Sequence, residues 1–84
     1  MILAALVSYT CLTVYAPRDV FVDYMAGQFG EVSQAVEVKS DNVAVELFAN
    51  PETRTWTVLM NESSGMSCVI GVGKGWHKPK GADL

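Results

Sequence analysis

The 84-residue sequence predicts an α+β fold in which one helix packs on a small antiparallel sheet of three to four strands. Two observations lead to this class. A stretch near residues 17–29 has helical spacing of apolar residues, and the segments after it alternate apolar and polar residues with a period of two. We expect an apolar N-terminal segment over residues 1–16, a single α+β domain over 17–73 and a basic, irregular tail over 74–84.

The helix is expected over residues 17–29. Pro17 suits the first helical position, where its missing N–H costs nothing, and Asp19 complements the positive end of the helix dipole. Gly30 is a natural stop because glycine tolerates the left-handed conformation that ends many helices. The stripe expected to face the sheet consists of Val20, Phe21, Tyr24, Met25 and Gln28.

Strands are expected over residues 33–38, 43–49, 55–60 and 66–72, because turn residues separate these alternating segments. One face of this meander is apolar, and we expect the helix to cover it. It comprises Val43, Val45, Leu47, Trp56, Val58, Met60, Cys68 and Ile70. The same alternation places Phe48 on the face away from the helix, which makes it a candidate for contact with a partner.

The N-terminal segment MILAALVSYTCLTVYA is apolar and uncharged. As a helix it would span about 24 Å, which is short for a membrane crossing, although membrane contact through residues 1–16 is one expectation. Val14-Tyr15-Ala16 loosely fits a signal-peptide cleavage site, but no basic residue opens the segment. The alternation over Val7–Tyr15 also fits a retained strand, so a retained strand or helix and a removed signal segment both stay open.

The net charge of −3 argues against general nucleic-acid binding. Lys74, Lys78 and Lys80 make the tail basic, which suits either an acidic partner or a solvated end. Trp76 in this tail is expected to dock on the sheet edge of the domain or on a partner.

The two cysteines, Cys11 and Cys68, leave two alternatives. In an exported domain they would form one disulfide, which the expected strand geometry permits. In a cytosolic protein they would be two buried thiols. No metal site and no cofactor are expected, since two cysteines and the single His77 do not supply a zinc site.

No catalytic constellation is expected either, so the chain is predicted not to be an enzyme. A Cys68–His77 pair would require the tail to fold back. Glu37 and Glu46 are expected on a solvated polar face. The glycine-rich run beginning at Gly71 lacks the spacing of a phosphate-binding loop.

Several motifs occur in a characteristic order: Ala16-Pro17-Arg18-Asp19-Val20, Gly30-Glu31, Val45–Ala49, Thr55-Trp56-Thr57 and Ser67-Cys68-Val69. In the order and spacing of these motifs, over about residues 16–76, the chain resembles a group of short uncharacterised exported proteins of alphaproteobacteria and their phages. The resemblance implies an exported domain with one disulfide and supplies no catalytic residues. The group has a cysteine directly before Ala16, where this chain has Tyr15, and Cys11 would take its place.

The function expected from these features is that of a non-enzymatic interaction or structural module. It would be a small accessory component of a larger assembly, such as a phage particle, with a protein partner or further copies of itself. The alternatives are a soluble periplasmic binding or inhibitor domain and, more remotely, a small cysteine-dependent enzyme. The expected location is the bacterial envelope or a virion.

Overall fold

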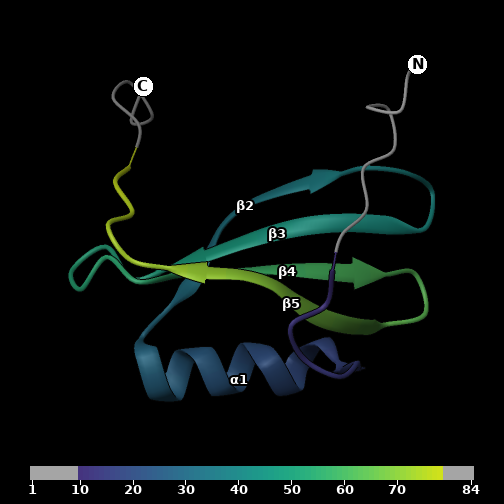
Figure 1. Cartoon of the computed structure of the whole chain (residues 1–84), viewed down its shortest axis with the longest axis horizontal. Coiled ribbons are helices and arrows are strands. Elements are labelled where there is room, and N and C mark those ends of the chain that lie inside the picture. The colour runs from purple at the N-terminus through teal and green to yellow at the C-terminus, as the bar shows by residue number, and fades with distance from the viewer. Residues whose placement is uncertain (1–9, 79–84) are drawn as a thin grey trace.

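A computed structural model describes residues 10–78 of the chain as one antiparallel sheet with a single helix beneath it (Figure 1). The elements in chain order are β1 (Ala16–Pro17), α1 (Arg18–Phe29), β2 (Val32–Val38), β3 (Val43–Ala49), β4 (Trp56–Glu62) and β5 (Met66–Gly73). The strand order is β1-β5-β4-β3-β2, so four consecutive strands form a meander and the short β1 extends it beyond β5. The predicted α+β class is confirmed, with five strands where three to four were expected.

The helix and the four long strands lie close to their predicted positions. Local signals explain this agreement. Gly30 adopts a left-handed conformation with φ of +64°, and its N–H donates to the carbonyl of Ala26, so the helix ends where glycine permits it. Asn50 begins the turn between β3 and β4, where its Oδ1 accepts hydrogen bonds from the backbone N–H groups of Glu52 and Thr53.

The prediction of which sheet face meets the helix is wrong. The core beneath the sheet is formed by Met25, Phe48, Leu59 and Val69. Phe48 is 1% exposed, so it is a core residue and no candidate for contact with a partner. Neighbouring residues along a strand point to opposite faces of the sheet. Leu47 and Val58, which pair with each other, precede the core residues Phe48 and Leu59, so the face expected to be covered is the one opposite α1.

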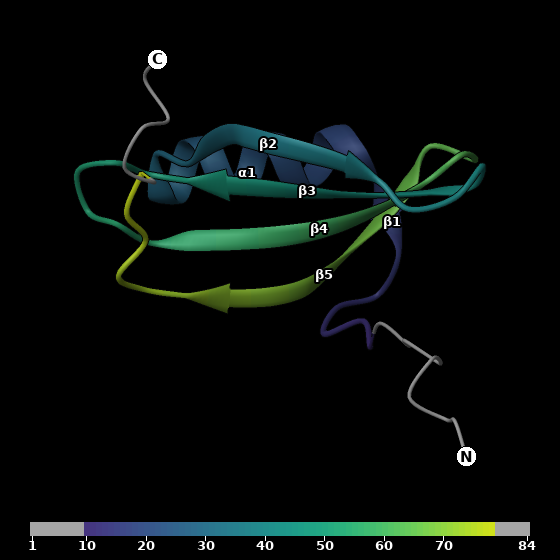
Figure 2. The same cartoon turned by 90° about the horizontal axis from the view of Figure 1, so that it is seen from above.

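The helix presents a slightly different stripe from the predicted one. Phe21, Val22 and Met25 pack toward the sheet, whereas Val20 and Tyr24 are exposed. In Figure 2, α1 runs roughly along the strands on the far side of the sheet. This one helix of the described residues lies against one face of the sheet only.

The described part of the N-terminal segment belongs to the domain. Residues 10–15 form no strand, contrary to the strand predicted over Val7–Tyr15, of which residues 7–9 lie outside the described range. Leu12 donates its N–H to the carbonyl of Val69, and the hydroxyl of Thr13 accepts from the N–H of Val69. These two bonds hold the segment along the outer edge of β5.

Candidate functional site

A disulfide joins Cys11 to Cys68, with 5.6 Å between their Cα atoms. Of the two alternatives raised by the sequence, the structure therefore contains the bridge. Cys68 pairs with Met60 across β4 and β5, so its side chain lies on the face opposite α1 and is fully buried there. A structural disulfide is compatible with an extracytoplasmic location. Within residues 10–78, no helix is long and apolar enough to cross a membrane.

The bridge removes the one nucleophile considered from the sequence. Cys68 has no free thiol, and His77 contacts Arg54 instead, with 2.7 Å between His77 Nε2 and Arg54 Nη2. The part of the chain that the structure describes also holds no cluster of three or more metal-ligating side chains.

The tail residues singled out from the sequence are only partly docked. Trp76 is half-buried, and its N–H donates to the carbonyl of Arg54 in the turn between β3 and β4. Lys74 and Lys78 are exposed, and Lys80 lies outside the described residues. The described lysines do not form one patch with Phe48, because that side chain is in the core.

The sheet face opposite α1, here called the open face, is apolar and partly exposed. Its half-buried members are Val43, Val45, Leu47, Trp56 and Val58. A shallow hollow of about 230 Å³ on it is lined by β2, β3 and β4. At its margin, every residue of the edge strand β2 is exposed, including Val36 at 58% and Val38 at 73%. An edge strand of seven exposed residues with few charges is an unusual feature, because proteins normally protect such edges.

A polar network crosses the sheet on the helix side near the start of α1. Glu46 is buried and accepts hydrogen bonds from Arg18 Nε at 2.9 Å and Nη2 at 2.8 Å. Ser33 donates to the same carboxylate at 2.7 Å and Asn61 at 3.0 Å, and Ser67 donates to the Asn61 carbonyl oxygen at 2.6 Å. Burial by itself would raise the pKa of Glu46, but these donors outweigh it, so the pKa is lowered. Four donated hydrogen bonds converge on the Glu46 carboxylate, so the network is best understood as structural.

The expectation that Glu37 and Glu46 share a solvated face is wrong for Glu46. Glu37 pairs with Val45 across β2 and β3, while Glu46 pairs with Val36, so the two carboxylates lie on opposite faces. Only Glu37 is solvated, with Lys39 Nζ at 3.2 Å.

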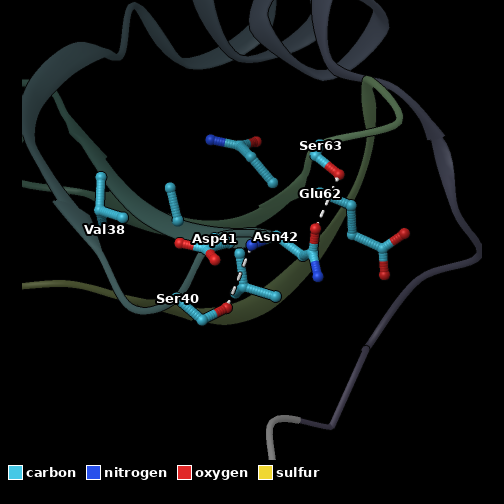
Figure 3. Close-up of a pocket in the computed structure, with 9 residues that line it drawn as sticks. Val38, Ser40, Asp41, Asn42, Glu62 and Ser63 are labelled. Atoms are coloured by element: carbon cyan, nitrogen blue, oxygen red, sulfur yellow. Dashed lines mark hydrogen bonds between the residues drawn. The ribbon is translucent and has the colours of Figure 1, made fainter.

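A shallow pocket of about 210 Å³ lies between the β2–β3 and β4–β5 hairpins (Figure 3). Its polar groups bind one another: the Ser63 hydroxyl donates to Asn42 Oδ1 at 3.3 Å, and the Asn42 N–H donates to the Ser40 hydroxyl at 3.2 Å. Asp41 and Glu62 add two carboxylates at its rim. These hydrogen bonds join the two hairpin turns, and the pocket between them is shallow.

The opposite end of the sheet holds a different kind of cavity, of about 340 Å³, beside the end of α1. Glu31 lines it and is 3% exposed, and its Oε1 has no hydrogen-bond partner. The burial of Glu31 and Glu46 was not predicted from the sequence, although both stand in the motifs Gly30-Glu31 and Val45–Ala49. One feature of the sequence could have drawn attention to Glu31. This acidic residue directly follows the glycine that ends the helix, and the last turn of the helix has no basic residue to balance its charge.

Comparison of the chain with protein-family models, with curated proteins and with solved structures gave no match.

Proposed function

We propose that the protein is a non-enzymatic interaction module of the bacterial envelope or of a phage particle, working as a small accessory component of a larger assembly. The observation that carries this proposal is the combination of an apolar open face with the exposed edge strand β2. The disulfide supports the location, since such bridges persist in oxidising compartments.

The proposal commits to a second copy of the chain as the partner at β2. An antiparallel two-fold pairing of β2 with itself would satisfy the free backbone groups of both edges and would join two sheets and two open faces into one surface. Charge permits it: within β2 only Glu37 is charged, and a pairing centred on Ala35 sets Glu37 opposite Ser33 of the second copy. No like charges are then brought face to face.

Sedimentation equilibrium of the full chain over a concentration series tests this arrangement. We expect wild-type protein to approach twice the monomer mass of 9.1 kDa. Val36→Lys, which places a charge at the exposed edge, should weaken the self-association by ten-fold or more. Val20→Lys is the matched control, because Val20 is 55% exposed and belongs to α1, not to β2, and this variant should associate like the wild type.

Two results would overturn the proposal. One is a wild-type chain that stays monomeric throughout the series. The other is an equal loss of association in Val36→Lys and Val20→Lys, which would mean that added charge alone disperses the protein.

A further inference from the structure

Glu31 occupies a position that disfavours a carboxylate. It follows Gly30 directly, and its backbone N–H donates to the carbonyl of Met25 at 3.1 Å as part of the helix cap. The C-terminal end of a helix carries partial negative charge, and the last turn of α1 has no basic residue to offset it. A buried carboxylate at this place has a strong unmet demand for a positively charged partner.

Among the described residues, no positively charged side chain pairs with Glu31. The ion pairs among them are Arg18–Glu46 and Lys39–Glu37, and neither involves Glu31. Lys74 lines the same cavity but is exposed and forms no ion pair with Glu31. A metal ion is a poor candidate, because Glu31 belongs to no group of three or more potential ligands within residues 10–78.

The walls of the cavity suit an organic cation. Besides Glu31 they include the aromatic residue Phe29 and the hydroxyl-bearing residues Thr55 and Thr57. Aromatic rings attract ammonium groups, and threonine hydroxyls accept hydrogen bonds from them.

A second cavity of about 260 Å³ adjoins the first between α1 and β5. The two share Phe29, Thr57 and Val72 as lining residues, so they are neighbours along one wall. The second cavity is almost wholly apolar and its lining adds Leu12, Thr13, Phe21, Tyr24, Met25 and Val69. A charged end and an apolar end therefore lie side by side.

We propose that these joined cavities form a binding site for an alkylammonium group, in which Glu31 pairs with the ammonium and the cavity between α1 and β5 takes the hydrocarbon chain. The ammonium belongs either to a free amphipathic amine or to a lysine side chain next to an apolar residue of a peptide. The site is independent of the edge strand β2 and of the self-association proposed above.

Titration of the ¹⁵N-labelled full chain with n-hexylammonium, followed by NMR, tests the site. We expect saturable shifts of the Glu31, Thr57 and Phe29 amide resonances, and no comparable saturation with n-hexanol, which has the same chain without the charge. Glu31→Gln should weaken the binding by ten-fold or more, since it removes the charge and keeps the shape. Glu37→Gln is the matched control, because Glu37 is an exposed carboxylate in an ion pair with Lys39.

A second arm distinguishes the two sources of the ammonium. An N-acetylated Leu-Lys amide that competes with n-hexylammonium and binds more tightly identifies a peptide lysine, whereas tighter binding of n-hexylammonium identifies a free amine. Lys74→Met tests whether Lys74 of the same chain competes with the ligand for Glu31. Stronger binding of n-hexylammonium to this variant would show such competition and would support the ammonium site at Glu31.

Thermal unfolding adds a readout that does not depend on a ligand. Glu31→Gln should be at least as stable as the wild type without ligand, because it removes an unpaired buried charge. The proposal fails if n-hexylammonium shows no saturable binding at millimolar concentration, or if Glu31→Gln binds it as tightly as the wild type does. Neither result would change the mass measured for the wild-type chain, so this site and the self-association are tested separately.

Discussion

At the scale of single residues, Glu46 has the most consequential environment. The alternation of the sequence put it on a solvated face, but the structure buries it under the guanidinium of Arg18, 28 residues away. Arg18 also stands over the Phe48 ring, with its Cζ atom 5.9 Å from the ring centroid. One ion pair therefore joins the start of α1 to the middle of the sheet and covers part of the core.

Glu46→Gln is expected to lower the free energy of unfolding by roughly 2 kcal/mol at neutral pH, because the ion pair is lost while the residue stays buried. We place the value below that of a fully buried pair because the Arg18 side chain is 45% exposed. Glu37→Gln, at the exposed pair with Lys39, should change it by less than about 0.5 kcal/mol. Urea unfolding of both variants measures the difference.

The pH dependence of that difference follows from the lowered pKa of Glu46 in the folded state. The unfolded chain takes up its proton near the ordinary value of 4.5, and the folded protein does so at a lower pH. The stabilisation by ionised Glu46 is thus complete well above pH 4.5 and is lost as the pH falls through the folded-state pKa. The gap between wild type and Glu46→Gln should narrow below about pH 4; a gap that is constant from pH 7 to pH 3 would contradict this account.

At the scale of elements, the end of α1 is held by Asn50, which begins the turn between β3 and β4. Gly30 has positive φ and lies so close to Asn50 that an added Cβ would stand 2.7 Å from its Nδ2 atom. The same Nδ2 donates to the carbonyl of Phe29 at 2.9 Å, which satisfies a carbonyl at the end of the helix. The Asn50 side chain thereby joins the helix end to the β3–β4 turn.

Two glycine substitutions test this junction. Gly30→Ala should destabilise the protein by about 1–2 kcal/mol, because alanine is strained at positive φ and displaces Asn50. Gly27→Ala should stabilise it by about 0.5–1 kcal/mol, because Gly27 lies within α1 with open space around its Cα. Thermal unfolding of the two variants should shift the midpoint in opposite directions, and a shift of the same sign would refute the assignment of the cap.

At the scale of the whole molecule, the protein combines a wide sheet with a small core. Four buried apolar side chains form the cluster between α1 and the sheet, and the open face has no comparable cover among residues 10–78. A domain of this size is expected to have a stability near 5 kcal/mol, at the low end of the usual range. The Cys11–Cys68 disulfide, which closes a separation of 57 residues, is therefore a large part of its stability.

Loss of the disulfide should lower the free energy of unfolding by about 2–4 kcal/mol, since a loop of this length restricts the unfolded chain strongly. Cys11→Ser together with Cys68→Ala removes the bridge without leaving a lone thiol. Urea unfolding of this variant, compared with the oxidised wild type, gives the value. Mass spectrometry after thiol alkylation without reductant should find both wild-type cysteines unmodified, and labelling of either would show that the bridge is absent.

The sequence by itself determined where the helix and the long strands lie. Their limits depend on local chemistry: the left-handed glycine at Gly30, the Asn50 turn and the period of apolar residues act within a few neighbouring positions. The pairing of Cys11 with Cys68 could likewise be considered from the sequence, because the chain has only two cysteines. Each of these features is a property of residues close in sequence or of a small set of candidates.

Only the tertiary structure decided which side of the sheet the helix covers. Alternation divides strand residues between two faces but does not say which face meets the helix, and here both are apolar: Phe48 and Leu59 on one, Leu47 and Val58 on the other. The environment of Glu31 was hidden for the same reason, since its burial depends on strands β4 and β5 brought beside the end of α1. Burial is a property of the assembled fold, and no local pattern in this sequence specifies it.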